Sequence, residues 1–116
     1  MFQIGQAVLG KYQFKDGSFP GSKRPYLIVD INESEIGMLC VSTVQDKYEK
    51  LLWRTNHTLL RYDPPFWKPS FVKLDSLIYC DIEKVGNVGK LLAGGKVLNK
   101  ADLNIILSRY KEFSDW

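Results

Sequence analysis

The side chains best suited to chemistry stand where apolar runs of the chain begin or end. Arg24 lies between a loop containing Gly and Ser and an apolar run that begins at Pro25. A planar guanidinium at the start of a strand suits a phosphate, and the simpler alternative is a solvated charge beside a turn. Ser42 and Thr43 end the next apolar run, where their hydroxyls either cap a turn or bind a phosphate oxygen.

These two strand ends are expected to meet in space. The runs 25–31 and 37–44 are rich in β-branched and apolar residues and flank the polar turn 32–35, which predicts an antiparallel hairpin. In such a hairpin the first residues of one strand lie opposite the last residues of its partner. Arg24 and Thr43 are therefore predicted to be neighbours.

A third candidate pair lies in the run 70–82. If this run is one strand, Lys73 and Asp75 point the same way, because side chains two apart share a face. On an open surface such a pair is an ion pair worth under about 1 kcal/mol, and in a cleft it is an acid–base couple. The run is longer than a typical strand, so a bend near Ser76 is expected.

Aromatic side chains stand in or beside the predicted loops: Phe14, Phe19, Phe66 and Trp67. Exposed rings stack on unpaired nucleobases, whereas buried rings close a core. Lys23 adds a second positive charge next to Arg24. The residues alone leave both interpretations of the aromatics open.

Several other kinds of site are not expected. The sequence has one histidine, His57, and two cysteines, Cys40 and Cys80, without Cys-x-x-Cys spacing, so we expect neither a metal site nor a disulfide framework. The cysteines are expected to be small buried hydrophobes, and His57 a surface or loop histidine. Glycine-rich phosphate-binding motifs and serine-nucleophile motifs are missing, and we expect no cofactor.

Length and charge narrow the class of protein further. The 116 residues, 45% of them apolar, suffice for a single domain over 1–116 with one modest core. Sixteen Lys and Arg against thirteen Asp and Glu leave a net charge of +3, which excludes a polycationic tail and allows a local basic patch. Neither a membrane helix nor a secretory signal is evident, so we expect a cytoplasmic protein without membrane contact.

The elements that must position these residues are mainly strands. Strands are expected over 6–12, 25–31, 37–44 and 70–82, with weaker candidates at 49–53 and 58–60. Three prolines in 62–69 exclude a central strand or helix interior there, and the glycines of 86–89 indicate a turn.

One helix is expected near the C-terminus. Asn99 is a good N-cap, and Asp102 can return a contact in a variant of the capping box. The apolar stripe of this helix comprises Leu103, Ile106, Leu107 and Tyr110. The polar side facing solvent comprises Lys100, Asp102, Asn104 and Lys111. The whole pattern predicts a mainly β fold, a strongly bent antiparallel sheet or barrel with a C-terminal helix packed on it.

Taken in order, these segments resemble the MazF/PemK family, the toxin ribonucleases of bacterial toxin–antitoxin pairs. The resemblance starts with Gly5–Val8 and continues with Arg24-Pro25 leading into an apolar strand. It extends through the hydroxyl-bearing segment 41–45 and the run 70–81, which leads to an acidic turn and a terminal helix.

The resemblance implies an SH3-like barrel, usually a homodimer, that cleaves single-stranded RNA such as mRNA without a metal and is neutralised by a cognate antitoxin. It places phosphate-binding roles on Arg24 and Thr43. It also places an acid–base pair on Lys73 and Asp75. Because lysine stands where that lineage of the family has arginine, the alternative is that the acid role moves to Arg24.

The implied chemistry is attack of a 2′-OH on its own phosphate, which needs a base, a cation and an acid. Asp75 is the best base, and Arg24 would stabilise the charge on the phosphoryl oxygens, since its pKa is too high for general-base work. Thr43 would orient the phosphate. The expected RNA-binding residues beside them are Lys23, Ser42, Lys73 and Phe19.

Two other functions compete with this hypothesis. A catalytically inactive SH3-like module that binds RNA or a peptide is suggested by the lysine at position 73 and by the Pro-Pro-Phe-Trp segment 64–67. The other competing function is that of a structural subunit whose apolar helix docks on another chain of a larger complex. The stretch 54–68 resembles an insertion that reshapes the RNA groove or the antitoxin site.

Overall fold

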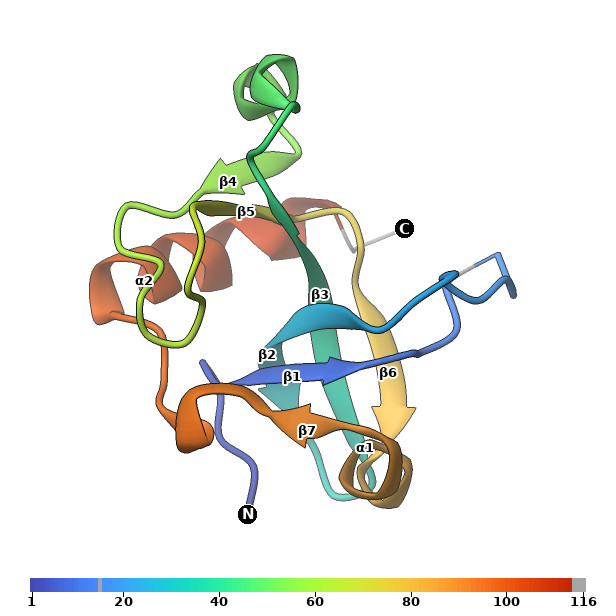
Figure 1. Cartoon of the computed structure of the whole chain (residues 1–116). Coiled ribbons are helices and arrows are strands. Elements are labelled where there is room, and N and C mark those ends of the chain that lie inside the picture. The colour runs from blue at the N-terminus through green and yellow to red at the C-terminus, as the bar shows by residue number, and fades with distance from the viewer. Residues whose placement is uncertain (15, 114–116) are drawn as a thin grey trace.

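The computed structural model describes residues 1–14 and 16–113, and it shows a bent antiparallel sheet with a helix across one side (Figure 1). The strands are β1 (Ala7–Gly10), β2 (Arg24–Ile31), β3 (Glu35–Thr43), β4 (Asn56–Thr58), β5 (Ser70–Lys73), β6 (Ile78–Asp81) and β7 (Lys90–Leu91). The helices are α1 (Ile82–Val88) and α2 (Lys100–Arg109), with short 3-10 helices η1 (Tyr48–Leu52), η2 (Leu92–Gly95) and η3 (Tyr110–Phe113).

Strand β3 is the central strand of the sheet. It pairs with β2 along one edge, and along its other edge with β6 at its beginning and β5 at its end. The strand order is β4-β5-β3-β2-β1-β7, and in the described residues the sheet stays open between β4 and β7. The expected mainly β fold, a strongly bent sheet with a C-terminal helix, is confirmed.

Both faces of the sheet are buried, because β2 and β3 are almost continuously apolar and successive side chains point to opposite faces. One face, called the helix face here, carries Leu27, Val29, Leu39 and Val41 against Ile106 and Tyr110. The other, called the tyrosine face, carries Tyr12, Tyr26, Ile28, Met38 and Cys40.

Helix α2 begins as the sequence predicts. The Asn99 side chain accepts a hydrogen bond from the Asp102 backbone N–H at 3.0 Å and donates one to the Asp102 carboxylate at 2.8 Å. Ile106 and Tyr110 are buried, and Leu103 and Leu107 pack beside them. Asp102, expected to face solvent, is instead fully buried.

The run 70–82 is not one strand. Strand β5 ends at Lys73 and β6 begins at Ile78. The bend expected near Ser76 is present, because the Ser76 hydroxyl donates to the Lys73 carbonyl at 2.6 Å and accepts the Cys40 N–H at 2.8 Å. The Ser76 hydroxyl thus takes the place of a backbone hydrogen-bond partner for Cys40 at the point where β5 has ended.

Two further expectations about elements are wrong. Residues 49–52 belong to η1 rather than to a strand, and Trp53 is the residue that caps its end. The turn expected over 86–89 is the end of α1, which packs the buried Val85 against the tyrosine face. The cost of Gly86 inside a helix is offset by that burial.

Cys40 is buried as expected and Cys80 is half-buried, and both are free thiols. None of the helices in the described part of the chain has the length and apolarity needed to cross a membrane.

Candidate functional site

The hairpin of β2 and β3 brings Arg24 to the end of β3, but the side chain on its face is that of Ser42. Tyr26 pairs with Cys40, so two residues back along β2 corresponds to two residues forward along β3. Side chains two apart on a strand share a face. Arg24 and Ser42 therefore both belong to the tyrosine face.

Thr43 lies on the helix face. With Pro25, Phe66 and Trp67 among others it lines a cavity of about 180 Å³ whose walls are mostly apolar. The expected proximity of Arg24 and Thr43 thus holds for the strand ends and not for the direction of the side chains. A shift of one residue along a strand exchanges its faces, and this places Ser42 rather than Thr43 beside the guanidinium.

Lys73 reaches the same face from the other side of β3. Val72 pairs with Val41, so Lys73 at the end of β5 comes next to Cys40. The Ser76 hydroxyl joins the two residues, since it contacts both the Cys40 N–H and the Lys73 carbonyl. Lys73 is half-buried there.

Two more lysines come from the segment that contains η1. The Lys47 Nζ donates to the Ser42 hydroxyl at 2.7 Å. The Lys50 carbonyl accepts from the Asn56 side chain at 2.9 Å, and Asn56 is the partner of Lys73 in the β4–β5 pair. We call Arg24, Lys47, Lys50 and Lys73 the cationic cluster.

The cationic cluster forms no salt bridge to a carboxylate among the described residues. Burial lowers the pKa of Lys73, and the positive charges of Lys50, Arg24 and Lys47 lower it further. Within residues 1–14 and 16–113, none of the four cations forms a salt bridge with a carboxylate. Converging cations with no acid between them favour the binding of an anion, and a phosphate suits lysine and arginine donors.

The floor of the cationic cluster is uncharged. Burial raises the pKa of the Cys40 thiol, and the Ser76 hydroxyl and nearby cations only partly offset this, so the thiol is protonated at neutral pH. Tyr12 and Tyr26 pack edge to face at 5.1 Å, and burial raises the pKa of Tyr12 to about 12. A neutral, low-dielectric floor strengthens the attraction of the cations for an anion.

Asp75 lies at the margin of the cationic cluster, in the turn after β5. It is exposed and lines a hollow of about 240 Å³ with Phe14, Asp16 and Ser76. Burial raises the pKa of Cys40 most, and the negative charge of Asp75 adds to this, which places Asp75 within electrostatic reach of the cluster. The premise that Asp75 shares a strand face with Lys73 is wrong, because β5 ends at Lys73, two residues before Asp75.

Lys23 and Phe19 stand farther out. Lys23 is exposed immediately before β2. Phe19 is 58% exposed in the segment 16–23, which stands off the sheet at the right of Figure 1. No hydrogen bond in the described chain ties the side chain of Lys23 to the cationic cluster.

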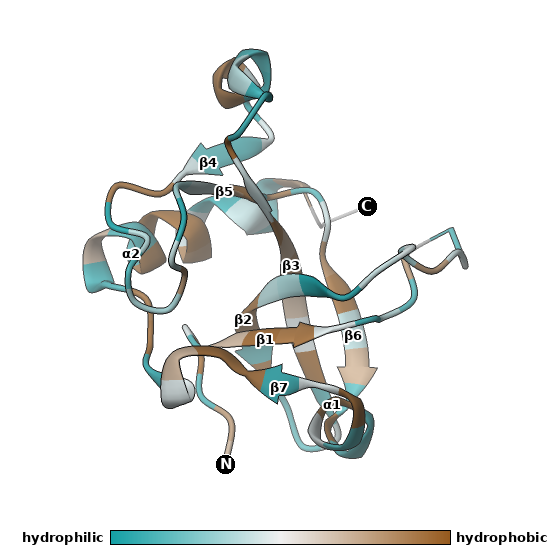
Figure 2. Cartoon of the chain, viewed as in Figure 1, coloured by the Kyte–Doolittle hydropathy of each residue, from teal (hydrophilic) through white to brown (hydrophobic). Residues whose placement is uncertain are grey.

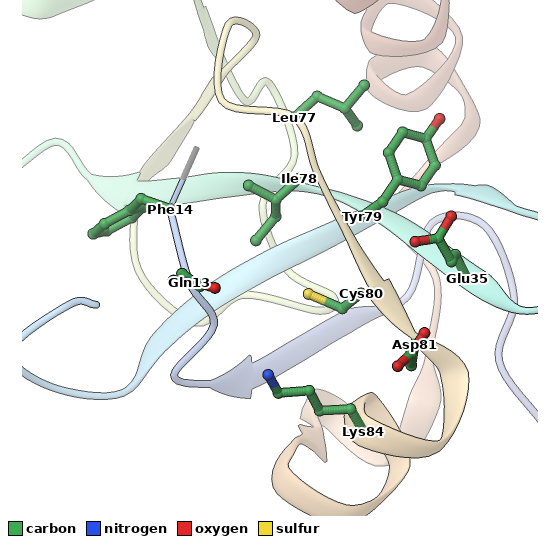
Figure 3. Close-up of a pocket in the computed structure, with 9 residues that line it drawn as sticks. All are labelled: Gln13, Phe14, Glu35, Leu77, Ile78, Tyr79, Cys80, Asp81 and Lys84. Atoms are coloured by element: carbon green, nitrogen blue, oxygen red, sulfur yellow. The ribbon is translucent and has the colours of Figure 1, made fainter. Parts of the chain in front are cut away.

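A second hollow, of about 440 Å³, runs along β6 (Figure 3). Its wall combines the apolar Phe14 and Ile78 with the charged Glu35, Asp81 and Lys84. Two acids against one lysine make this hollow a poor place for a phosphate. No group of three or more His, Cys, Asp or Glu side chains in the described residues is arranged to hold a metal ion.

The sequence interpretation missed one buried network. The fully buried Asp102 carboxylate accepts the backbone N–H groups of Leu60 and Arg61 at 3.0 and 2.9 Å, and its Oδ1 lies 2.9 Å from the His57 Nε2. Together with the Asn99 side chain, these groups tie the stretch 57–61 to α2. His57, expected on the surface or in a loop, is a partner in a structural network.

The sequence interpretation also missed Lys47 and Lys50. The only local signal was two lysines three residues apart followed by an aromatic, Trp53. That spacing suits one face of a helix, whereas the segment 49–53 was expected only as a weaker strand candidate.

Comparison with known proteins bears on the fold. No family model and no curated protein matches the sequence. Among solved structures, the chain matches an endoribonuclease in complex with its cognate antitoxin from a mycobacterial species, with a TM-score of 0.61 and 14% identity, over 100% of this chain and 99% of that one. The chain has the fold of that endoribonuclease. The resemblance seen in the sequence is thereby confirmed at the level of the fold.

Proposed function

We propose that the chain is a toxin endoribonuclease that cleaves single-stranded RNA, mRNA included, and so inhibits translation and growth until a cognate antitoxin neutralises it. The observation that carries the proposal is the cationic cluster: four cations and the Ser42 hydroxyl converge without a carboxylate partner among the described residues. The shared fold with an endoribonuclease supports the same function.

The proposed reaction needs no metal. The 2′-oxygen attacks its own phosphate, the new O–P bond forms, and the bond to the 5′-oxygen breaks, leaving a cyclic phosphate and a 5′-OH. Arg24 and Lys47 would stabilise the charge on the non-bridging oxygens, as donors do in oxyanion holes. Ser42 takes the orienting role that the resemblance gave to Thr43, because Ser42 shares the face of Arg24.

In the proposed reaction Lys73 acts as the general acid and Asp75 as the general base. Lys73, whose pKa is lowered by burial and neighbouring cations, would give a proton to the leaving 5′-oxygen more readily than an exposed lysine. Asp75 would take the proton of the 2′-OH from the turn beside the cluster. Lys23 and Phe19 would contact the RNA strand farther along.

The assembly and location belong to the same proposal. Residues 1–116 would act as one domain, because β2 and β3 contribute to both apolar clusters. The family resemblance adds a homodimer that works in the cytoplasm, where mRNA is, and that its antitoxin binds. Light scattering of the purified chain tests the dimer, and a monomer would contradict it.

The test of the activity is cleavage of a single-stranded RNA panel in EDTA. Wild type should cut, and Arg24→Ala should lose about 100- to 1,000-fold in rate, as expected for one transition-state donor. Arg61→Ala is the matched control, because Arg61 is an exposed arginine that lies outside the cationic cluster. Absence of cutting by wild type, or equal rates for both variants, would contradict the proposal.

A non-catalytic RNA-binding module is the second candidate. It is favoured by Asp75, which lies outside the strand where an acid–base partner of Lys73 was expected. Such a module would bind single-stranded RNA in an Arg24-dependent way and cut none of it. The same panel therefore separates the two candidates when binding is measured beside cleavage.

A further inference from the structure

The short helix η1 buries none of its residues, although much of it is apolar. Leu52 is 89% exposed, Tyr48 67% and the adjacent Trp53 52%. In Figure 1 this segment is the green coil that stands clear of the sheet above β4, and Figure 2 shows apolar and polar colours side by side on it. Large exposed aromatics on a projecting segment point to a binding surface.

The aromatic surface is continuous with the cationic cluster. The Lys50 Nζ lies 5.6 Å from the centroid of the Trp53 ring, in a cation–π contact. Lys50 also lies close enough to Lys73 for its charge to lower the pKa of that lysine. At the start of the segment, Lys47 is bonded to Ser42. The same short stretch thus supplies two cations to the cluster and the ring beside them.

This combination fits one kind of occupant. Proteins hold single-stranded nucleic acid with cations along the backbone and aromatic rings on which unpaired bases stack. An apolar peptide would use the rings but would gain nothing from Lys47 and Lys50, and it would have to desolvate them. Charge complementarity therefore favours a polyanion with exposed planar bases.

We propose that Trp53, with Tyr48 beside it, is the stacking platform for an unpaired base of the RNA strand whose phosphate lies in the cationic cluster. The identity of the strand as a substrate rests on the proposed function; the stacking itself does not. The platform restricts binding to single strands, because a paired base does not offer its face, and it fixes which phosphate reaches Arg24 and Lys73.

The experiment uses a short 2′-O-methyl RNA, which cannot be cleaved because its 2′-oxygen is blocked. Its affinity is measured by fluorescence anisotropy at constant salt for wild type, Trp53→Ala and Trp53→Phe. Loss of one stacked base should weaken binding by about 5- to 100-fold in Trp53→Ala, and Trp53→Phe should keep most of the affinity. Leu60→Ala, another large exposed apolar residue, is the control and should bind as wild type does.

A duplex of the same sequence completes the design. Its weaker binding should be the same for wild type and Trp53→Ala, because no base is free to stack. Equal affinity of wild type and Trp53→Ala for the single strand would overturn the proposal, as would an equal loss for single strand and duplex. An unchanged thermal unfolding midpoint shows that the variant is folded.

The outcome also separates this inference from the nuclease proposal. Trp53-dependent binding of the blocked strand, with no cutting of the unblocked one, supports the platform and overturns the nuclease. Cutting of the unblocked strand with binding that does not depend on Trp53 supports the nuclease and overturns the platform. A Trp53→Ala variant that binds RNA normally but no longer binds an antitoxin peptide would show that the surface serves a protein, and would overturn the platform.

Discussion

Asp102 and Lys73 are both charged groups with little exposure to water, and among the described residues they differ in how their charges are paired. The Asp102 carboxylate is fully buried and is contacted by two backbone N–H groups, the Asn99 amide and His57. Lys73 is half-buried among three other cations, with no salt bridge to a described carboxylate. The compensated charge ties the chain to itself, and the uncompensated charge remains available to a ligand.

The pKa values of the two groups express the same difference. Burial alone would raise the pKa of Asp102, but hydrogen bonds from Asn99, Leu60, Arg61 and His57 lower it below its ordinary value. Burial lowers the pKa of Lys73, and its cationic neighbours add to the effect. Folding therefore favours the charged form of Asp102 and disfavours the charged form of Lys73.

The largest expected effect is on stability. Asp102→Ala removes the acceptor of four donors and should lower the free energy of unfolding by about 3–5 kcal/mol, the cost of breaking a buried charge network. Urea unfolding measures it. Asp16→Ala, which removes an exposed carboxylate, should change stability much less. Similar losses in the two variants would show that the hydrogen bonds of Asp102 do not stabilise the fold.

Lys73→Met should affect activity rather than stability, in contrast to Asp102→Ala. Cleavage of single-stranded RNA in single-turnover assays should fall by about 100- to 1,000-fold, because a transition-state contact is lost. The free energy of unfolding should stay the same or rise, since methionine removes a charge that the fold disfavours. A large loss of stability in this variant would show that Lys73 is structural.

The pH dependence of cleavage sharpens the role of Lys73. As general acid it must be protonated, so the rate should fall as pH rises through its folded pKa, which lies below the ordinary 10.5. In Lys73→Arg the rate should persist to higher pH, because the pKa of arginine is above about 12. Identical alkaline limbs for the two proteins would exclude Lys73 as the acid.

Acid unfolding tests Asp102 with a smaller effect. Its folded pKa is below its ordinary 3.8, so its contribution to stability is present above 3.8 and is lost as pH falls from there through the lower folded value. The urea midpoint should therefore decline over this range in wild type. Asp102→Asn, which does not titrate, should show a shallower decline, and an equal decline in both would contradict the assignment.

The smallest expected effect is on the salt dependence of binding. A strand held by three or four phosphate contacts should give a slope of log affinity against log salt of about −2 to −3, since each contact contributes about −0.7 for single strands. Arg24→Ala should make the slope shallower by about 0.7, and Arg61→Ala should leave it unchanged. A slope near zero would mean that the cationic cluster does not hold the phosphates.

The sequence allows prediction of features that depend on neighbours in the chain. The β2–β3 hairpin, the Asn99 cap and the position of Arg24 at a strand start follow from local patterns of apolar residues and turns. The choice between Ser42 and Thr43 does not follow, because it depends on the register of two strands, and a shift of one residue exchanges the faces.

Contacts between segments far apart in the chain explain the other differences between the expected and the observed site. Asp102 is expected to face solvent as long as its backbone donors at Leu60 and Arg61, more than forty residues earlier, are not known. Lys47 reaches Ser42 from five residues further along the chain, but Lys50 becomes part of the site because β4 pairs with β5 and returns its segment to Lys73. No periodicity in the sequence reports such a pairing.

Because η1 buries no residue, it can be exchanged without cost to either apolar cluster. The segment is held to the rest of the fold by two hydrogen bonds, from Lys47 to Ser42 and from Asn56 to the Lys50 carbonyl. On the proposed platform, replacement or lengthening of residues 48–53 would alter which RNA strands bind while leaving the folding free energy nearly constant. The proposal thereby assigns recognition to a segment on which neither apolar cluster depends, so that recognition could change in evolution without loss of the fold, and a graft of this segment would redirect it.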